Sequence, residues 1–341
     1  MTTDTSPKER LLRVLQKKPV DRPPVLCVGG MMNAAVIDVM EKSGNRLPEA
    51  YSDAGQLSAL ARDVSRFTGF ENLALPFCMT LEAEMLGSAV ELGTAASEAK
   101  VTKEAFTSVR DATIPKLDRV PDGSRAERVL LAIERTAAVE SDNPVVGSLT
   151  GPISTSASLV DPITFLKELH KDHEGAHRVI DSVTHALMLF ARAMVDSGVD
   201  VIAISDPTAT GEILGPRAFS EYALRYLNDL ADQIHQLGVP VIMHICGDIS
   251  SVEGLVAQLH TDATSTDAAV NLAKFKARHP QVTTMGNTST YTLQFGSAEQ
   301  VFRHTRQLVQ QGVDIIAPAC GLSTSTPLSN IQALTNAAKE S

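Results

Sequence analysis

In the second half of the chain, a histidine and a cysteine have the types and the spacing of half a metal site. His244 and Cys246 end a short apolar run that is predicted as a strand over residues 239–246. Side chains of a strand alternate between its two faces, so residues two positions apart point the same way. An imidazole nitrogen and a sulfur would therefore converge, as zinc ligands do. The same pattern also occurs where a histidine of the core lies beside an ordinary buried thiol, without a metal.

The elements that must position these residues alternate along the chain. Alternating strands and helices favour a parallel sheet, and eight such units in 341 residues favour a (β/α)8 TIM barrel formed as a single domain, residues 1–341. We also expect an N-terminal helix from Pro7 to about Lys17 and a small hairpin excursion within residues 88–120, through residues 90–93 and 108–110. The eight predicted strands begin near residues 25, 72, 145, 200, 240, 262, 282 and 313.

This topology brings a second cysteine to the same place. The active site of such a barrel lies at the carboxyl ends of its strands. Cys246 follows the fifth predicted strand and Cys320 follows the eighth, so both thiols are expected at that end. One His and two Cys are typical of a catalytic zinc that keeps its fourth position open. Because two thiolates donate charge to the metal, the site suits the binding and activation of a substrate thiol better than the formation of hydroxide.

Other polar residues follow strands at the same end. Asp206 ends the fourth predicted strand, where it could orient a ligand or hold His244 from behind. Asn287 ends the seventh. Glu82 and Glu84 follow the second, and they could supply a fourth metal ligand or cap the next helix.

Two further groups are better explained by structure than by chemistry. His170, His173 and His177 fall at helical spacing among charged residues, which favours a solvated helix face over a second metal site. Cys27 and Cys78 lie near strand ends without a neighbouring histidine, and we interpret them as core thiols.

Composition excludes several classes of partner. The formal net charge of −10 disfavours binding to nucleic acid or to anionic lipid. No apolar run of about 18 residues is present, so no membrane span is expected. The first ten residues lack the apolar core of a secretion signal, and the four cysteines are widely spread, so we expect reduced thiols and a cytoplasmic location.

Several stretches of the chain resemble the methylcobamide:coenzyme M methyltransferases, a family within the uroporphyrinogen decarboxylase-like superfamily. The resemblance covers nearly the whole chain, in the right order. The stretches that carry it are residues 29–33 (Gly-Gly-Met-Met-Asn), 76–84, 150–152, 206–209, 244–247, 286–287, 317–321 and 326–328.

The resemblance implies a fold, a metal and a reaction. Those enzymes are (β/α)8 barrels with one Zn²⁺ per chain, and the matching ligand positions here are His244, Cys246 and Cys320. The zinc-bound thiolate of a small acceptor, most often coenzyme M, attacks the methyl group of a methyl-Co(III) corrinoid on a partner protein. Its products are a methyl thioether and Co(I). We predict that Asp206, Asn287, Glu84 and Met32 line the substrate site.

Two alternatives remain open. The decarboxylase branch of the superfamily carries an Arg-Gln-Ala-Gly-Arg element after its first strand, whereas residues 29–33 here offer no arginine to bind the carboxylates of a porphyrinogen. The other alternative is a zinc-stabilised barrel that docks a corrinoid protein without catalysis. The acceptor also stays open, because no cationic residue can be placed near the metal for a sulfonate; homocysteine, another thiol or a pterin are the other candidates.

Overall fold

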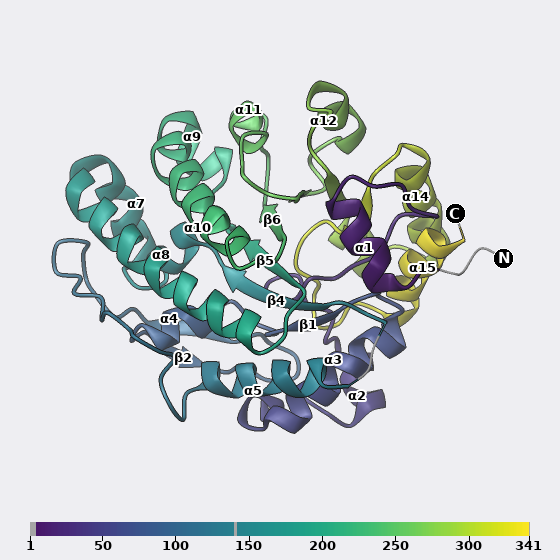
Figure 1. The fold of residues 1–341 in the computed structure, drawn as a ribbon, viewed down its shortest axis with the longest axis horizontal. Helices are drawn as coiled ribbons and strands as arrows, with labels where there is room; N and C mark the ends of the chain where they lie inside the picture. Colours follow the sequence, from purple (N-terminus) through teal and green to yellow (C-terminus); the bar gives the residue numbers. More distant parts are fainter. Residues whose placement is uncertain (1–4, 140–141, 341) are drawn as a thin grey trace.

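Seven parallel strands curl into a barrel with helices packed around them (Figure 1). The computed structural model describes residues 5–139 and 142–340. The strands pair in the order β1-β4-β5-β6-β7-β8-β9, which confirms the TIM-barrel class. They are β1 (Leu73–Leu75), β4 (Val145–Thr150), β5 (Val201–Ser205), β6 (Val241–Ile245), β7 (Ala263–Thr266), β8 (Thr284–Thr288) and β9 (Ile315–Pro318).

Helices follow most of the strands, and short additional helices precede several of the long ones. Local sequence explains many of their ends: Ser297 and Gln300 form a capping box at the start of α14, and the Ser6 hydroxyl accepts from the Glu9 amide at the start of α1. The helices are α1 (Pro7–Leu15), α2 (Ile37–Ser43), η1 (Glu49–Ser52), α3 (Ala54–Thr68), α4 (Leu81–Met85), α5 (Arg125–Ala137), α6 (Pro152–Ala157), α7 (Pro162–Lys171), α8 (His173–Asp196), α9 (Gly211–Ala218), η2 (Phe219–Leu224), α10 (Arg225–His235), α11 (Glu253–Val256), α12 (Leu272–Arg278), α13 (Thr290–Phe295), α14 (Ala298–Gln310) and α15 (Leu328–Lys339).

The eighth position of the barrel is filled by residues 25–28, which do not form the predicted strand. Val25 makes a single parallel bridge to Ile316 of β9. On the other side, towards β1, the side chain of Asn72 takes the place of strand-to-strand hydrogen bonds. Its Oδ1 accepts from the Cys27 amide at 2.9 Å and its Nδ2 donates to the Cys27 carbonyl at 2.8 Å. The preceding prolines lack amide hydrogens, and Gly29 and Gly30 have positive φ, so regular pairing is interrupted at both ends. We call residues 25–28 the seam.

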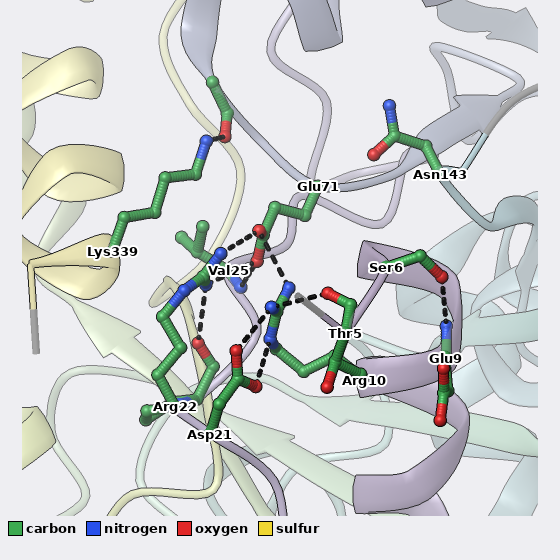
Figure 2. A network of polar contacts seen from close by, with 12 residues as sticks. Thr5, Ser6, Glu9, Arg10, Asp21, Arg22, Val25, Glu71, Asn143 and Lys339 are labelled. Atoms are coloured by element: carbon green, nitrogen blue, oxygen red, sulfur yellow. Dashed lines mark hydrogen bonds and ion pairs between the residues drawn. The ribbon is translucent and has the colours of Figure 1, made fainter. Parts of the chain in front are cut away.

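A buried network of charges fixes the amino end of the seam (Figure 2). The carboxylate of Glu71 accepts hydrogen bonds from Arg10, from Arg22 and from the Val25 amide. Arg10 also donates to Asp21, at 2.8 and 2.7 Å. The network therefore ties α1, the loop after it and the start of the seam to Glu71, two residues before β1.

Two apolar cores hold the barrel together. The larger lies between the strands and the helices. The smaller fills the barrel interior and includes Leu11, Val14 and Leu15, so α1 closes the amino-terminal end. The interior residues contributed by the strands and the seam include Leu26, Val28, Val146, Val201, Ile242, Met285 and Ile315.

The excursion between α4 and α5 is a hairpin, but its second strand is not where it was predicted. The hairpin pairs β2 (Ala89–Glu91) with β3 (Lys100–Lys103), whereas residues 108–110 form no strand. Its tip reaches the loop after β9, since the Thr324 hydroxyl donates to the Ala96 carbonyl. None of the helices in the described ranges is long and apolar enough to cross a membrane.

Candidate metal centre

Three predicted ligands meet at the carboxyl end of the barrel. His244 is in β6, Cys246 follows β6 directly, and Cys320 follows β9. The two Sγ atoms lie 3.2 Å apart, well beyond the ~2.05 Å of a disulfide bond, and both thiols are free. One ligand atom from each of the three residues lies within 4.8 Å of the others. This is the group that can hold a metal within the described part of the chain.

Two glycines allow the chain to turn at these positions. Gly247 has a φ of +72°, so the backbone can turn sharply just after Cys246. At Gly321, an added Cβ would lie only 2.8 Å from the Met31 carbonyl oxygen. The loop after Cys320 is thereby held against the segment that follows the seam.

The ring of His244 is oriented by one hydrogen bond. Its Nδ1 lies 3.0 Å from the Ser265 hydroxyl, which comes from the neighbouring strand β7. Its Nε2 is buried and has no hydrogen-bond partner among the described residues. An orphaned buried nitrogen is costly unless something binds it. A metal ion held with the two sulfurs would supply the missing partner.

The two thiols differ because they share a hydrogen bond. That bond raises the pKa of Cys246, and burial raises it further. The same bond lowers the pKa of Cys320, against burial and the negative charges of Asp267 and Glu98. The shared bond thus favours a state in which one sulfur is a thiolate and the other keeps its proton. Zinc binding would favour the thiolate form of both ligands.

Asp267 is a residue near the trio that was not predicted. Its Oδ2 lies 3.8 Å from the Cys246 sulfur, so a carboxylate stands beside the candidate metal position. Asp267 follows β7 directly, and the rule that selected Asp206 and Asn287 at strand ends would have found it. Ser265 carries no such signal, because a serine inside a strand is ordinary.

Asp206 is buried at the end of β5, where it caps another element. It accepts from the amides of Ile153 and Ser154, at 2.9 and 2.8 Å, and from the Ser154 hydroxyl at 2.6 Å. Burial raises its pKa to about 6, although these hydrogen bonds oppose the shift. Its side chain therefore holds the start of α6, and the place behind His244 belongs to Ser265.

Asn287 and Met32 lie close to the trio. The Asn287 side chain donates to the carbonyls of Asp267 and Val270, both at 2.8 Å, so it fixes the loop that carries Asp267. Met32 is fully buried, and its sulfur lies 3.9 Å from the Ser265 hydroxyl. Asn287 thus contacts the loop after β7, and Met32 contacts the serine that holds His244.

The two glutamates after β1 are engaged elsewhere. Glu84 accepts from Arg125 at 2.6 Å, and the buried Glu82 accepts from the amide and hydroxyl of Thr150. Arg125 also donates to the Cys78 sulfur at 3.0 Å, so this core thiol has a cationic partner that its sequence context did not indicate. The Cys27 thiol is buried and donates to the Met32 carbonyl.

The histidine row on α7 and α8 forms contacts between helices. His173 lies 2.9 Å from Glu221, and His177 lies 2.9 Å from the Tyr226 hydroxyl. Residues His170, His173 and His177 do not form a metal-holding group within the described ranges. The solvated-face interpretation was too simple, because two of the three join α8 to η2 and α10.

Comparisons with known proteins identify the family of the chain. The family model described as uroporphyrinogen decarboxylase (URO-D) matches residues 6–341. The methylcobamide:CoM methyltransferase MtbA of Methanosarcina acetivorans is 30% identical over 339 residues, 99% of this chain and 98% of the relative. The MtaA methyltransferase of Methanosarcina barkeri is 28% identical over 337 residues, with 98% and 97% covered.

A solved structure extends the likeness to three dimensions. A methyltransferase from Methanosarcina mazei superposes with a TM-score of 0.92 at 28% identity, covering 98% of both chains. A B12-independent methionine synthase from Shewanella shares the fold at a TM-score of 0.60 and 12% identity. The chain therefore belongs to the uroporphyrinogen decarboxylase (URO-D) family and, within it, to the methylcobamide:CoM methyltransferases.

Proposed function

We propose that this methyltransferase moves a methyl group from a methyl-Co(III) corrinoid, carried by a partner protein, to the sulfur of a small thiol. The observation that carries the proposal is the convergence of a His244 ring nitrogen with the sulfurs of Cys246 and Cys320 at the carboxyl end of the barrel, together with the unpartnered, buried Nε2 of His244. Three such ligands leave one tetrahedral position for an acceptor.

The donor set supports zinc. Sulfur and imidazole ligands in this number favour Zn²⁺ over oxygen-preferring cations. When bound, zinc would lower the pKa of an acceptor thiol and so supply a thiolate nucleophile at neutral pH. His244, Cys246 and Cys320 would hold the ion, and Asp267 stands where it could occupy the open position until an acceptor arrives.

The reaction is a direct displacement. The acceptor thiolate forms a new bond from its sulfur to the methyl carbon while the cobalt–carbon bond breaks. The electron pair of that bond stays on cobalt, which leaves as Co(I). The thiol proton goes to solvent at the mouth, so the step requires no base from the protein.

Coenzyme M is the acceptor to test first, because the relatives are named for it. The negative charges of Asp267 and Glu98 both raise the pKa of Cys320. Since a sulfonate would meet these carboxylates, the acceptor panel should also include homocysteine and cysteamine.

Two measurements test the proposal. Metal analysis of the purified chain should give about one zinc per chain, in keeping with a single ligand trio. Free methylcobalamin with each thiol should then yield the methyl thioether, followed by the absorbance change as Co(III) becomes Co(I). Zinc without methyl transfer to any thiol would favour the alternative of a docking barrel. A purified chain that holds no zinc, and whose metal content does not change in His244→Ala, would refute the proposal altogether.

A further inference from the structure

The ring of His244 lies in a polar layer that crosses the barrel interior. In parallel strands, residues paired in register point to the same face of the sheet. Ser205 of β5 pairs with His244, and His244 pairs with Ser265 of β7. All three side chains are buried. His244 therefore stands between two serines that are alike in type, burial and strand position.

Only one of these serines holds the histidine. The Ser265 hydroxyl lies 3.0 Å from Nδ1, whereas the Ser205 hydroxyl has no hydrogen-bond partner in the described structure. Ser265 has a second neighbour, the Met32 sulfur, at 3.9 Å. The hydroxyl oxygen thus lies between an imidazole nitrogen and a thioether.

The Met32 thioether offers the hydroxyl hydrogen of Ser265 a second acceptor. A thioether sulfur carries no hydrogen and can only accept. The contact with Met32 gives the single hydroxyl hydrogen of Ser265 an acceptor other than Nδ1, and with the hydrogen there an oxygen lone pair is free to accept from Nδ1–H of His244. A ring with its proton on Nδ1 presents the lone pair of Nε2, which is the ring nitrogen that has no partner among the described residues.

We propose that Ser265 and Met32 are positioning residues that hold His244 in its Nδ1–H tautomer, with Nε2 ready to bind the metal. The inference rests on the proposed zinc site and adds the residues that prepare it. Met32 is itself fixed, because its amide and carbonyl exchange 2.9 Å hydrogen bonds with Gly29 and its carbonyl accepts from the Cys27 thiol.

The partner of His244 is neutral, and this matters for the acceptor. A carboxylate at the Ser265 position would add negative charge to a centre that already has two thiolates. A serine orients the ring without that charge, so the metal keeps enough positive charge to attract a third, incoming thiolate.

The first test compares the two serines. Ser265→Ala should weaken zinc binding about 10- to 100-fold, as loss of such a supporting contact typically does. Ser205→Ala removes an equally buried hydroxyl beside the same ring and should leave the zinc Kd unchanged. Competition with a chromophoric chelator measures both. Equal Kd values for the two variants would overturn the proposal, whereas a wild-type chain without zinc would instead defeat the proposed function.

The second test observes the tautomer directly. In metal-free protein labelled with ¹⁵N-histidine, the signals of His244, identified by their absence in His244→Ala, should show Nδ1 protonated and Nε2 not. Met32→Leu fills the same space but cannot accept, so Ser265 can turn its hydrogen toward Nδ1 and the Nε2–H form should become populated. Nε2–H as the wild-type form would overturn the assignment of Ser265. If Met32→Leu still shows only the Nδ1–H form, Met32 is not a positioning residue.

Discussion

Replacing Glu71 by glutamine should destabilise the whole barrel, although the residue lies far from the metal. Glutamine keeps the shape and one acceptor oxygen, but it removes the charge that Arg10 and Arg22 share. The side chains of Glu71 and Arg10 are only 5% and 4% exposed, so solvent cannot replace the lost interaction. Removing one partner of a buried ion pair costs about 3–5 kcal/mol. Because Arg10 keeps its ion pair with Asp21, we expect a loss at the lower end of this range, about 3 kcal/mol.

Urea unfolding followed by circular dichroism measures this loss. With a slope of about 3 kcal/mol per M for a chain of this size, the midpoint should fall by about 1 M. Glu299→Gln is the matched control, since Glu299 pairs with Arg303 on the surface, where their side chains are 84% and 65% exposed. That change should stay within about 0.5 kcal/mol. A Glu71→Gln midpoint equal to that of the control would show that the network does not hold the seam.

Three further outcomes follow from the site and from Asp206. Cys320→Ser and His244→Ala should lose most of the bound zinc by elemental analysis, while Cys78→Ser, outside the trio, should keep it. Treatment with a strong chelator should abolish methyl transfer from methylcobalamin, and added Zn²⁺ should restore it; activity that persists in the metal-free chain would contradict the proposed role. The pKa of Asp206 is raised from 3.8 to about 6, so the folded state favours its protonated form. Its contribution to stability is therefore present below about pH 4 and lost as pH rises through about 6, a change of up to about 3 kcal/mol that Asp206→Asn should not show in urea midpoints across that range.

The sequence predicted the barrel and the ligand trio for the same reason. Strand ends of a parallel barrel share one face, so placing Cys246 and Cys320 after strands was enough to bring them together. The seam could not be foreseen, because its hydrogen bonds on the β1 side come from the side chain of Asn72 and from Glu71. An apolar run does not reveal which groups pair with its backbone.

The partners of individual side chains were the other gap. Asp206 and Glu84 stand at the predicted end of the barrel, yet their carboxylates bind the start of α6 and Arg125. Position along a strand indicates which end a residue occupies, but not which neighbour takes its hydrogen bonds. Ser265 was missed for the converse reason, since its role depends wholly on contacts with residues far away in the chain.

The seam has a consequence for how this barrel can diversify. A strand that pairs on both sides is locked in register along its whole length, and a change in it disturbs two neighbours. Here a few side chains anchor residues 25–28, and the residues that follow lie beyond the last bridge to β9. Residues 31–33 form no strand, so a change there leaves the register of the sheet intact, whereas Gly29 and Gly30 are fixed by their positive φ and by the 2.8 Å bond from the Gly30 amide to the Pro76 carbonyl. Because Met32 belongs to this stretch and packs in the barrel interior, a change there would alter the contact with Ser265 while the seven-stranded sheet keeps its pairing.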